Sequence, residues 1–385
     1  MTQNNIKGEY MGNSKLSNAK KEKNDEFYTQ YNDIEKEIST YLDYNSDVFR
    51  GKTVLLPCDN PEWSNFTKFF VRNFKRLGLK KLISTSYEIN KNGKIFTLID
   101  NKIGDGKINI DDLECSYLKG DGDFKSDEVK VLCNEADIIV TNPPFSLFRE
   151  FIMWLVKADK QFLLIGNMNA ITYKEVFPLI KENKIWLGAT NFNKGMYFQV
   201  SDDFIYNNTY KFKREQNGVK VNRVAGVCWF TNIEHGRRHQ PMSLMTMVDN
   251  IKFSKHKELN GKEYVRYVNF DAIDVPFTNS IPKDYRGVMG VPKSFMGSYC
   301  VEQFKILGYE REDENIKVGI HHMPEEFLSD YRKQGGRGHY TKGMKMLCCY
   351  DSDEKAKIPF SRILIKYTEE WIESHTDDFK QNFRS

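Results

Sequence analysis

The sequence lacks the features that would assign it to a disulfide-rich, metal-binding or fibrous class of protein. Its seven cysteines are an odd number and include no Cys-x-x-Cys pair, so we expect free thiols in a reducing compartment. The cysteines and histidines have no spacing typical of structural zinc, and we predict no metal site. Only 25 Gly and 11 Pro occur among 385 residues, which excludes a collagen-like or low-complexity chain.

The chain also lacks any segment that predicts export or membrane insertion. Residues 1–23 are polar and contain several lysines, without the apolar stretch of a signal peptide. No apolar run approaches the ~20 residues that a membrane span needs. From these absences we expect a cytoplasmic protein that has no membrane partner.

Charge of one sign is not in excess either, whereas aromatic residues are abundant. Lys and Arg number 57 and Asp and Glu 53, so the net charge of +4 excludes a histone-like polycation. A nucleic-acid role would therefore need local basic clusters. Aromatic residues make up 14% of the chain and supply both a large core and flat surfaces on which bases stack. At roughly 100–200 residues per domain, the length predicts two domains.

The hydrophobic pattern predicts how these domains are arranged along the chain. Residues 1–24 lack periodicity, and we expect them to be disordered. From residue 25 to about 235, short apolar strands alternate with helical apolar spacing, which is typical of an α/β fold with a parallel sheet. Helical periodicity then fades and Pro and Gly turns multiply, so a second domain is expected over residues 236–385.

Individual elements follow from the same pattern. Strands are expected at 54–56, 82–87, 137–140 and 162–165, and helices at about 34–42, 66–77, 126–135, 148–155 and 172–182. Residues 90–119 are expected to be irregular, with turns at 92–93 and 105–106. Three later strand-like segments, 196–200, 210–213 and 224–230, have no helices between them and predict antiparallel additions to the sheet edge.

The strongest chemical signal is the loop Thr141-Asn142-Pro143-Pro144-Phe145, which directly follows the strand at 137–140. Ligands of open parallel sheets bind beyond the carboxyl ends of the strands, and two prolines make this loop rigid. The side-chain carbonyl of Asn142 and the backbone carbonyl of Pro143 are two acceptors that suit an exocyclic NH₂ group. Phe145 offers a face for a planar base. The pattern predicts a pocket for an amino-bearing nucleobase, although a turn that merely connects strand and helix has the same composition.

This loop resembles motif IV of the amino-methyltransferases that use S-adenosylmethionine, and Asn at its first position is typical of adenine-specific members. More specifically, the chain is similar to the EcoRI-type adenine-specific DNA methyltransferase family. The similarity extends in order over most of the chain, through residues 25–30, 58–61, 64–66, 122–124, 136–150, 228–232, 287–292 and 362–366.

The resemblance implies a Rossmann-like methyltransferase sheet over residues 25–235 and a target-recognition, DNA-binding region over 236–385. It implies S-adenosyl-L-methionine as the cofactor, double-stranded DNA as the substrate and a cognate restriction endonuclease as a candidate partner. The implied reaction is methyl transfer to the exocyclic N6 amine of a flipped-out adenine. The implied catalytic loop consists of Asn142, Pro143, Pro144 and Phe145.

The resemblance also implies cofactor contacts from segments that flank the first two strands and from a later loop. These residues are Phe27, Tyr28, Thr29, Pro57, Cys58, Asp59, Tyr87, Asp123 and Phe124. The glycine-rich fingerprint of many methyltransferases is absent. A helix cap or turn explains Asp59 equally well, and Asp121-Gly122-Asp123 is also a good turn. Glu88 follows the second strand, where many relatives hold the ribose, but it also suits a solvated surface.

Basic clusters in the second domain are candidate DNA contacts, namely Arg237, Arg238, Arg332, Lys333, Arg337 and Lys342. Arginine in glycine-bearing segments can follow a phosphate backbone or reach guanine edges, whereas a solvated basic surface has the same composition. Two other functions stay open at this point. One is a methyltransferase acting on RNA or on protein glutamine, and the other is a catalytically inactive DNA-binding relative.

Overall fold

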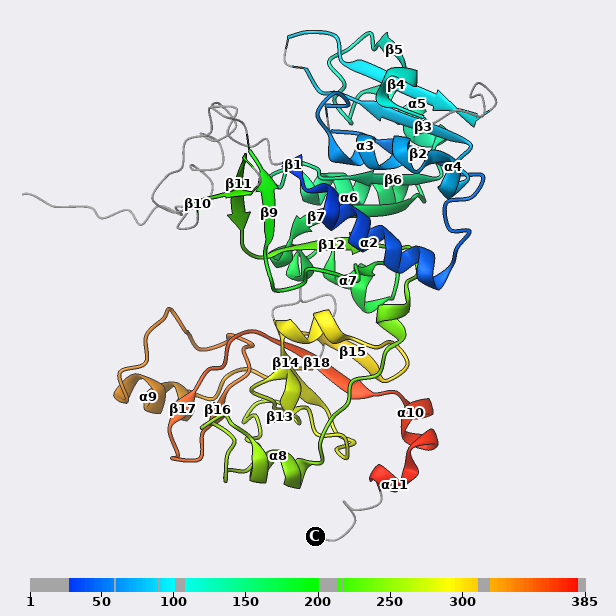
Figure 1. Ribbon diagram of the computed structural model, residues 1–385. Coiled ribbons are helices and arrows are strands. Elements are labelled where there is room, and N and C mark those ends of the chain that lie inside the picture. Colours follow the sequence, from blue (N-terminus) through cyan, green and yellow to red (C-terminus); the bar gives the residue numbers. More distant parts are fainter. Residues whose placement is uncertain are drawn as a thin grey trace, which may run out of the picture. The chain divides into compact units, whose positions relative to one another are not determined.

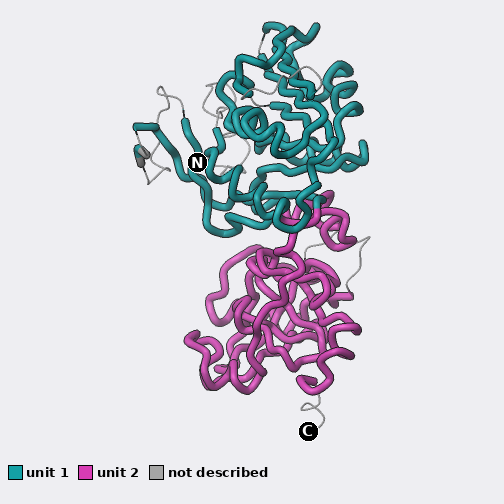
Figure 2. The backbone as a smooth tube through the Cα atoms, turned by 45° about the vertical axis from the view of Figure 1, so that its right-hand side comes forward, with its two compact units in different colours: residues 1–170, 188–233 teal, residues 171–187, 234–385 magenta. Residues whose placement is uncertain are grey.

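The structure is a computed structural model that describes residues 28–58, 60–88, 90–100, 108–200, 213–216, 218–310 and 319–379 (Figure 1). Phe27, Asp59 and the expected disordered segment 1–24 lie outside these residues. The chain forms two compact units (Figure 2). Unit 1 comprises residues 1–170 and 188–233, and unit 2 comprises residues 171–187 and 234–385. The segment 171–187, which the sequence pattern places with the first domain, therefore groups with unit 2.

Unit 1 is built on a mixed sheet whose central strands are parallel. These are β2 (Thr53–Leu56), β3 (Lys81–Thr85), β6 (Ile138–Thr141) and β7 (Gln161–Asn167). Seven of the eight strands belong to unit 1 and pair in the order β5-β4-β3-β2-β6-β7-β12. Because β2 lies between β3 and β6 and runs parallel to both, the direction of winding reverses at β2. Ligands of open α/β sheets bind at such a reversal. The parallel strands and their order confirm the predicted Rossmann-like fold class.

Residues 90–119 contain a β-hairpin, so the prediction that this region is irregular is wrong. Strand β4 (Lys94–Ile99) pairs antiparallel with β3, and β5 (Glu114–Tyr117) pairs antiparallel with β4. All four residues of β5 are exposed, so its sequence lacks the apolar alternation that reveals a strand. The two reversals return the chain to the edge where β3 ends.

Of the three later strand-like segments, 196–200 and 224–230 contribute to different sheets and so do not extend one edge, whereas residues 210–212 lie outside the described residues. Strand β12 (Val227–Thr231) is the last strand that unit 1 contributes to the main sheet; it runs antiparallel to β7, and all five of its residues are buried. The segment 196–200 belongs to a separate antiparallel sheet with the order β1-β9-β11-β10. Its strands are β1 (Tyr28–Thr29), β9 (Met196–Gln199), β10 (Lys213–Gln216) and β11 (Val219–Val224).

Among the described residues of unit 1, the helices are α2 (Tyr31–Tyr44), α3 (Asn65–Arg72), α4 (Phe74–Leu77), α5 (Asp127–Glu135) and α6 (Phe148–Lys157). The helix predicted over 66–77 is divided at Asn73 into α3 and α4. Ser64 Oγ caps the start of α3, and Gly78, with φ of 64°, ends α4 in the left-handed conformation that favours glycine. Apolar side chains of α2, α3 and α4 pack with β2, β3 and β6 in one buried core.

Unit 2 holds a second sheet of strands β13 (Ile273–Asp274), β14 (Met289–Pro292), β18 (Arg362–Tyr367) and β15 (Phe304–Tyr309), paired in that order. Its other elements are α7 (Phe177–Lys181), β8 (Trp186–Leu187), α8 (Met247–Phe253), α9 (Glu325–Lys333), β16 (Cys349–Tyr350), β17 (Ala356–Lys357), α10 (Glu369–Ser374) and α11 (Thr376–Phe379). Helix α7 is shorter than the helix predicted over 172–182. Arg362 Nε lies 2.8 Å from Asp274 Oδ1, and this buried ion pair joins β18 to β13.

Short 3₁₀ helices occur at Ile110–Asp112, Met168–Thr172, Gly236–His239, Thr278–Ser280 and Lys293–Ser298. Within the described ranges, no helix has the length and apolar content needed to cross a membrane.

Candidate active site

The loops that follow β2 and β6 are joined directly at the carboxyl edge of the main sheet. Thr141, the last residue of β6, donates a hydrogen bond from its buried hydroxyl to the carbonyl oxygen of Pro57, the first residue after β2. The predicted base loop, which begins at Asn142, and the predicted cofactor loop at Pro57 and Cys58 therefore start side by side.

The loop Asn142–Phe145 is a tight connection between β6 and α6. Pro143 is buried and Pro144 exposed, whereas Asn142 and Phe145 are half-buried. The backbone N–H of Leu147 donates to the carbonyl of Pro144 at 2.8 Å, and the ring of Phe145 packs partly against the core. The loop is thus held at both ends, Asn142 and Phe145 are half-buried, and the side-chain oxygen of Asn142 is enclosed.

The β4–β5 hairpin brings the loop containing Asp123 to the end of β3. The backbone N–H of Glu88 donates to the carbonyl of Asp121 at 2.8 Å. Gly122 has φ of 87°, and a Cβ atom there would lie 2.1 Å from the carbonyl oxygen of Ser86. Only glycine permits this close approach. The two predicted cofactor residues Tyr87 and Asp123, 36 positions apart in the chain, thereby come into one region.

The electrostatics of Tyr87 support that proximity. Its side chain is 52% exposed, and its pKa is raised by partial desolvation and by the carboxylates of Asp121 and Asp123. Asp123 also accepts a hydrogen bond at Oδ1 from the backbone N–H of Lys125 at 2.9 Å, which fixes its carboxylate. An exposed aromatic ring and a carboxylate together suit a heterocycle that carries an amine.

Phe124, in contrast, is not an open stacking surface. Its side chain is 6% exposed, and its ring lies 5.0 Å from that of Phe151 and 5.5 Å from that of Trp154 on α6. The structure therefore places Phe124 in the packing between its loop and α6, and leaves Tyr87 as the accessible ring.

Strand β1 reaches the same region of unit 1 through α3. The side chain of Asn65, the first residue of α3, donates to the carbonyl of Thr29 at 2.8 Å, and Tyr28 and Thr29 pair with β9. Among the described residues, the buried hydroxyls of Thr29 and Thr85 have no hydrogen-bond partner. A buried hydroxyl without a partner costs about 1–3 kcal/mol. Two such groups, on β1 and at the end of β3, fit a site that takes a polar ligand.

Backbone strain marks the end of β2. Cys58 has φ of 71°, a left-handed conformation that residues with a Cβ atom rarely adopt. Strain of this kind concentrates at ligand sites, where the surrounding structure holds it in place. The neighbouring candidate Asp59 lies outside the described residues, as does Phe27.

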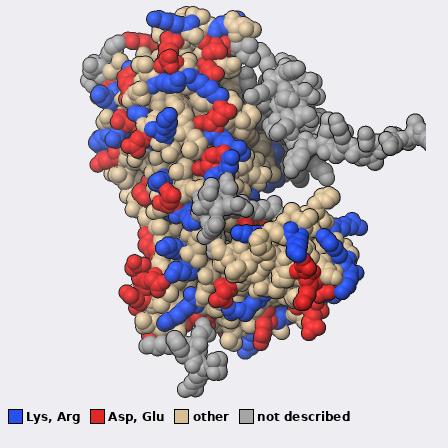
Figure 3. Space-filling view, turned by 180° about the vertical axis from the view of Figure 1, so that it is seen from behind, with Lys and Arg blue, Asp and Glu red and all other residues tan. Residues whose placement is uncertain are grey.

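Five of the six basic candidates in unit 2 are exposed: Arg237, Arg332, Lys333, Arg337 and Lys342. Arg332 Nη2 donates to the carbonyl of Tyr340 at 2.9 Å, and Lys342 forms an ion pair with Glu325. The end of α9 and the segment after it therefore form one folded basic region. Figure 3 shows that lysine and arginine side chains are interspersed with acidic ones on the face that it presents.

Arg238 is a correction to the predicted DNA contacts, because its side chain is only 5% exposed. Its guanidinium forms an ion pair with Glu234 at 3.0 Å, donates to Asn183, and stacks 3.7 Å from the ring centre of Trp186. A guanidinium enclosed in this way packs unit 2 and cannot reach a phosphate. Nothing in the sequence pair Arg237-Arg238 indicates that the first side chain is exposed and the second buried.

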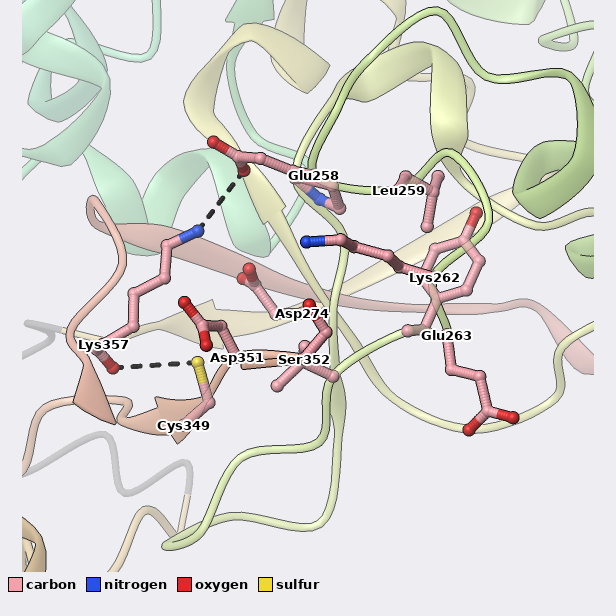
Figure 4. A pocket seen from close by; sticks show the side chains of 12 residues that line it. Glu258, Leu259, Lys262, Glu263, Asp274, Cys349, Asp351, Ser352 and Lys357 are labelled. Carbon is pink, nitrogen blue, oxygen red and sulfur yellow. Dashed lines mark hydrogen bonds and ion pairs between the residues drawn. The ribbon is translucent and has the colours of Figure 1, made fainter. Parts of the chain in front are cut away.

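A pocket of about 200 Å³ lies within unit 2 and contains none of the predicted site residues (Figure 4). Lys357, on its lining, pairs with Glu258 at 3.3 Å. Figure 4 also shows Cys349, and burial raises the pKa of that thiol to about 12. The thiol therefore stays protonated at neutral pH and is no nucleophile. The candidate active site remains at the sheet edge of unit 1.

Comparison with known proteins decides the family. The model of the adenine-specific methyltransferase EcoRI family matches residues 15–368. The chain belongs to this family. It is 42% identical over 308 residues to the Type II methyltransferase M.EcoRI of Escherichia coli, covering 78% of this chain and 90% of that protein.

Two mycoplasma proteins are also similar. The Type II methyltransferase M.MgeORF184P of Mycoplasma genitalium is 39% identical over 76% of this chain and 85% of its own length. The Type II methyltransferase M.MpnI of Mycoplasma pneumoniae is 36% identical over 76% of this chain and 84% of its own length. No solved structure matches the chain. This protein is thus an adenine-specific DNA methyltransferase, as its sequence predicts.

Sequence reasoning assigned no role to two buried residues of unit 1, Thr141 and Glu37. Thr141 gives no signal beyond its position at the end of a strand. Glu37 does give one, because it lies in the apolar helical stripe of Ile34, Ile38 and Tyr41 and is fully buried. An acid within an apolar stripe must find hydrogen-bond donors when the helix packs.

Proposed function

We propose that this protein transfers a methyl group from S-adenosyl-L-methionine to the N6 amine of an adenine at a specific site in double-stranded DNA. The observation that carries the proposal is the hydrogen bond from Thr141 to Pro57, because it sets a loop suited to an amino-bearing base beside a candidate cofactor loop. Membership of the adenine-specific family supports the choice of base.

The cofactor site would be formed by Tyr28, Thr29, Pro57, Cys58, Tyr87 and Asp123. S-adenosylmethionine supplies a methyl group on a positively charged sulfonium. The unpartnered hydroxyls of Thr29 and Thr85 provide hydrogen-bonding capacity for a polar ligand. The ring of Tyr87 and the carboxylate of Asp123 offer an aromatic face and an acceptor for an adenine amine.

Catalysis would rest on fixed acceptors. The side-chain carbonyl of Asn142 and the backbone carbonyl of Pro143 accept the two hydrogens of the target amine and draw them from the ring plane. The amine lone pair, localised on nitrogen, would attack the methyl carbon in line while the carbon–sulfur bond breaks and the sulfur leaves as a thioether, and the methylated amine would then lose one proton to water. Positioning and preorganised dipoles supply most of the rate enhancement, and no covalent bond to the protein is needed.

The target adenine must leave the duplex to reach such a loop, and the ring of Phe145 would stack on it there. In unit 2, Arg237 and the basic region of Arg332, Lys333, Arg337 and Lys342 would contact the phosphate backbone. These contacts position the duplex, whereas base contacts of unit 2 would select the site. Because the relatives are named Type II methyltransferases, a cognate restriction endonuclease is a proposed partner.

The direct test is the transfer of labelled methyl groups from S-adenosylmethionine to equal amounts of DNA, RNA and protein. Label should enter DNA alone, and modification-sensitive sequencing of that DNA should show N6-methyladenine at one short sequence. Label in RNA or protein, or methylation on cytosine, would contradict the proposal. If the protein binds DNA but transfers no methyl group from added S-adenosylmethionine, it is an inactive DNA-binding relative.

A further inference from the structure

A fully buried carboxylate outside the candidate active site, that of Glu37 on α2, joins two segments that are distant in the chain. Its Oε1 accepts hydrogen bonds from Tyr41 Oη at 2.9 Å and from the backbone N–H of Ala189 at 2.8 Å. Its Oε2 accepts from the backbone N–H of Thr190 at 2.8 Å and from Thr190 Oγ1 at 2.5 Å. Three of these donors belong to the segment just before β9.

The fit around this carboxylate is close. A Cβ atom on Gly188 would lie 2.3 Å from Glu37 Oε1 and 2.4 Å from the Cβ atom of Trp229, so only glycine allows the segment to approach. One turn earlier on α2, Asp33 Oδ1 accepts from Asn191 Nδ2 at 3.1 Å. The start of α2 and residues 188–191 are thus held together at two levels.

These bonds close a ring that contains β1. From Tyr28 and Thr29 the chain passes through the first turns of α2 to Glu37, and from Glu37 the hydrogen bonds lead to Ala189 and Thr190. The chain then continues into β9, where Phe198 and Gln199 pair with Thr29 and Tyr28. The ring consists of two stretches of chain joined by two sets of hydrogen bonds. Glu37 makes one set, and the pairing of β1 with β9 makes the other. A two-residue strand such as β1 has little pairing of its own and depends on the rest of the ring.

We propose that Glu37 is a positioning residue for the cofactor site, acting through the segment 188–191 and β9 to hold Tyr28 and Thr29 in place. The inference rests on the proposed function, which assigns cofactor contacts to β1. If the ring opens, the protein stays folded but its binding-competent fraction falls, and the apparent affinity for cofactor falls in proportion.

The test is isothermal titration of the full-length protein with S-adenosylhomocysteine, the product form of the cofactor, without DNA. In Glu37→Gln an amide N–H₂ replaces one carboxylate oxygen and faces a backbone N–H donor. We expect Kd to rise at least about tenfold, which corresponds to a competent fraction of about one tenth. Methyl transfer at saturating cofactor should change by less than about threefold, because binding and not chemistry is affected.

The matched control is Ile38→Ala. Ile38 is the next residue of α2, is fully buried and lies in the apolar core of unit 1. Its truncation should lower the melting temperature as much as Glu37→Gln or more, while leaving Kd within about twofold in the folded protein, because core truncation creates a cavity without breaking the ring. A second variant, Thr190→Val, removes one donor to Glu37 and keeps the backbone bonds, and should give a smaller rise in Kd.

A wild-type Kd in folded Glu37→Gln, or an equal rise in Ile38→Ala, overturns the inference alone. If Glu37→Gln does not fold, Thr190→Val decides in its place, and an unchanged Kd in that variant overturns the inference. If the wild-type protein does not bind S-adenosylhomocysteine, the proposed cofactor itself is wrong, and the role of Glu37 falls with it.

Discussion

Thr141 and Pro57 lie 84 positions apart in the chain and are joined by a hydrogen bond from the threonine hydroxyl to the proline carbonyl. Proline has no backbone N–H, so Pro57 has only this carbonyl with which to bond a neighbouring strand end. The bond links the start of the loop that carries Asn142 to the start of the loop that carries Cys58. This hydrogen bond therefore fixes how far apart the two loops begin, and with them the proposed base and cofactor sites.

Thr141→Val tests this link. Valine keeps the shape of threonine but removes the donor, which leaves the buried carbonyl of Pro57 without that partner. We expect the free energy of unfolding of unit 1 to fall by about 1–3 kcal/mol and the methyl-transfer rate to fall with it. Thr141→Ser keeps the hydroxyl and should retain most activity. Equal rates in the Val and Ser variants would show that the link has no catalytic importance.

Asn142→Ala tests the proposed amine acceptor. The variant should lose more than tenfold in turnover, a change of more than about 1.4 kcal/mol in the activation free energy. It should still bind S-adenosylhomocysteine with wild-type affinity and melt at the wild-type temperature. Turnover above about one tenth of wild type, measured in single-turnover assays, removes Asn142 from the catalytic role.

Phe145 is half-buried, so its replacement separates stacking from packing. Phe145→Tyr and Phe145→Trp should stay active, because any flat ring supplies the stacking energy of about 1–3 kcal/mol. Phe145→Ala should lose much of its activity on a paired duplex and regain part of it where the target adenine is mispaired and opens more easily. The measurement is methyl transfer to two duplexes that differ only in the partner of the target adenine. If Phe145→Ala equals wild type on the paired duplex, the ring only packs against the core.

The neighbours Arg237 and Arg238 should respond in opposite ways to replacement. Arg237→Ala, and the pair Arg332→Ala with Lys333→Ala, should weaken DNA binding, and each lost phosphate contact should lower the slope of log K against log salt by roughly 0.9. Arg238→Ala should leave the salt slope unchanged in the folded protein and lower the melting temperature, because it removes a buried guanidinium from Glu234 and Trp186. The reverse pattern would show that Arg238, and not Arg237, contacts DNA.

Two buried groups should give the units opposite responses to acid. In unit 1, burial raises the pKa of Glu37 from 4.5 to about 6, so the folded state binds its proton more readily than the unfolded state. Its contribution to stability therefore increases by about 2 kcal/mol as the pH falls from about 6 to 4.5. In unit 2, burial lowers the pKa of His235 from 6.5 to about 4, and its Nε2 lies 2.9 Å from the carbonyl of Leu187. Neutral His235 stabilises the fold, and about 3 kcal/mol is lost as the pH falls from 6.5 to 4.

Calorimetry between pH 7 and 5 checks this prediction. As the pH falls, His235 should move the transition of unit 2 to lower temperature and Glu37 should move that of unit 1 to higher temperature, and His235→Asn should reduce the shift of unit 2. Parallel shifts of both transitions in wild type and in His235→Asn would show that other groups control the pH dependence.

The sequence alone determined those features of the methyltransferase that depend on residues close together in the chain. Apolar periodicity predicted β2, β3, β6 and β7 and the helices between them, because each pattern reflects one face of one element. The position of Asn142–Phe145 at the end of a strand was likewise local and indicated a nucleobase pocket, whereas the family was predicted from matches spread in order over most of the chain.

Only the tertiary structure decided what depends on partners far away in the chain. Exposed β5 becomes a strand because β4 offers it an edge, and that pairing carries Asp123 to Tyr87. Arg238 is buried while Arg237 is exposed, since residues 171–187 fold onto unit 2 and enclose one of two identical side chains. Glu37 meets its donors 152 and 153 positions later in the chain. Hydrogen bonding and burial depend on distance in space, and a linear pattern records only distance along the chain.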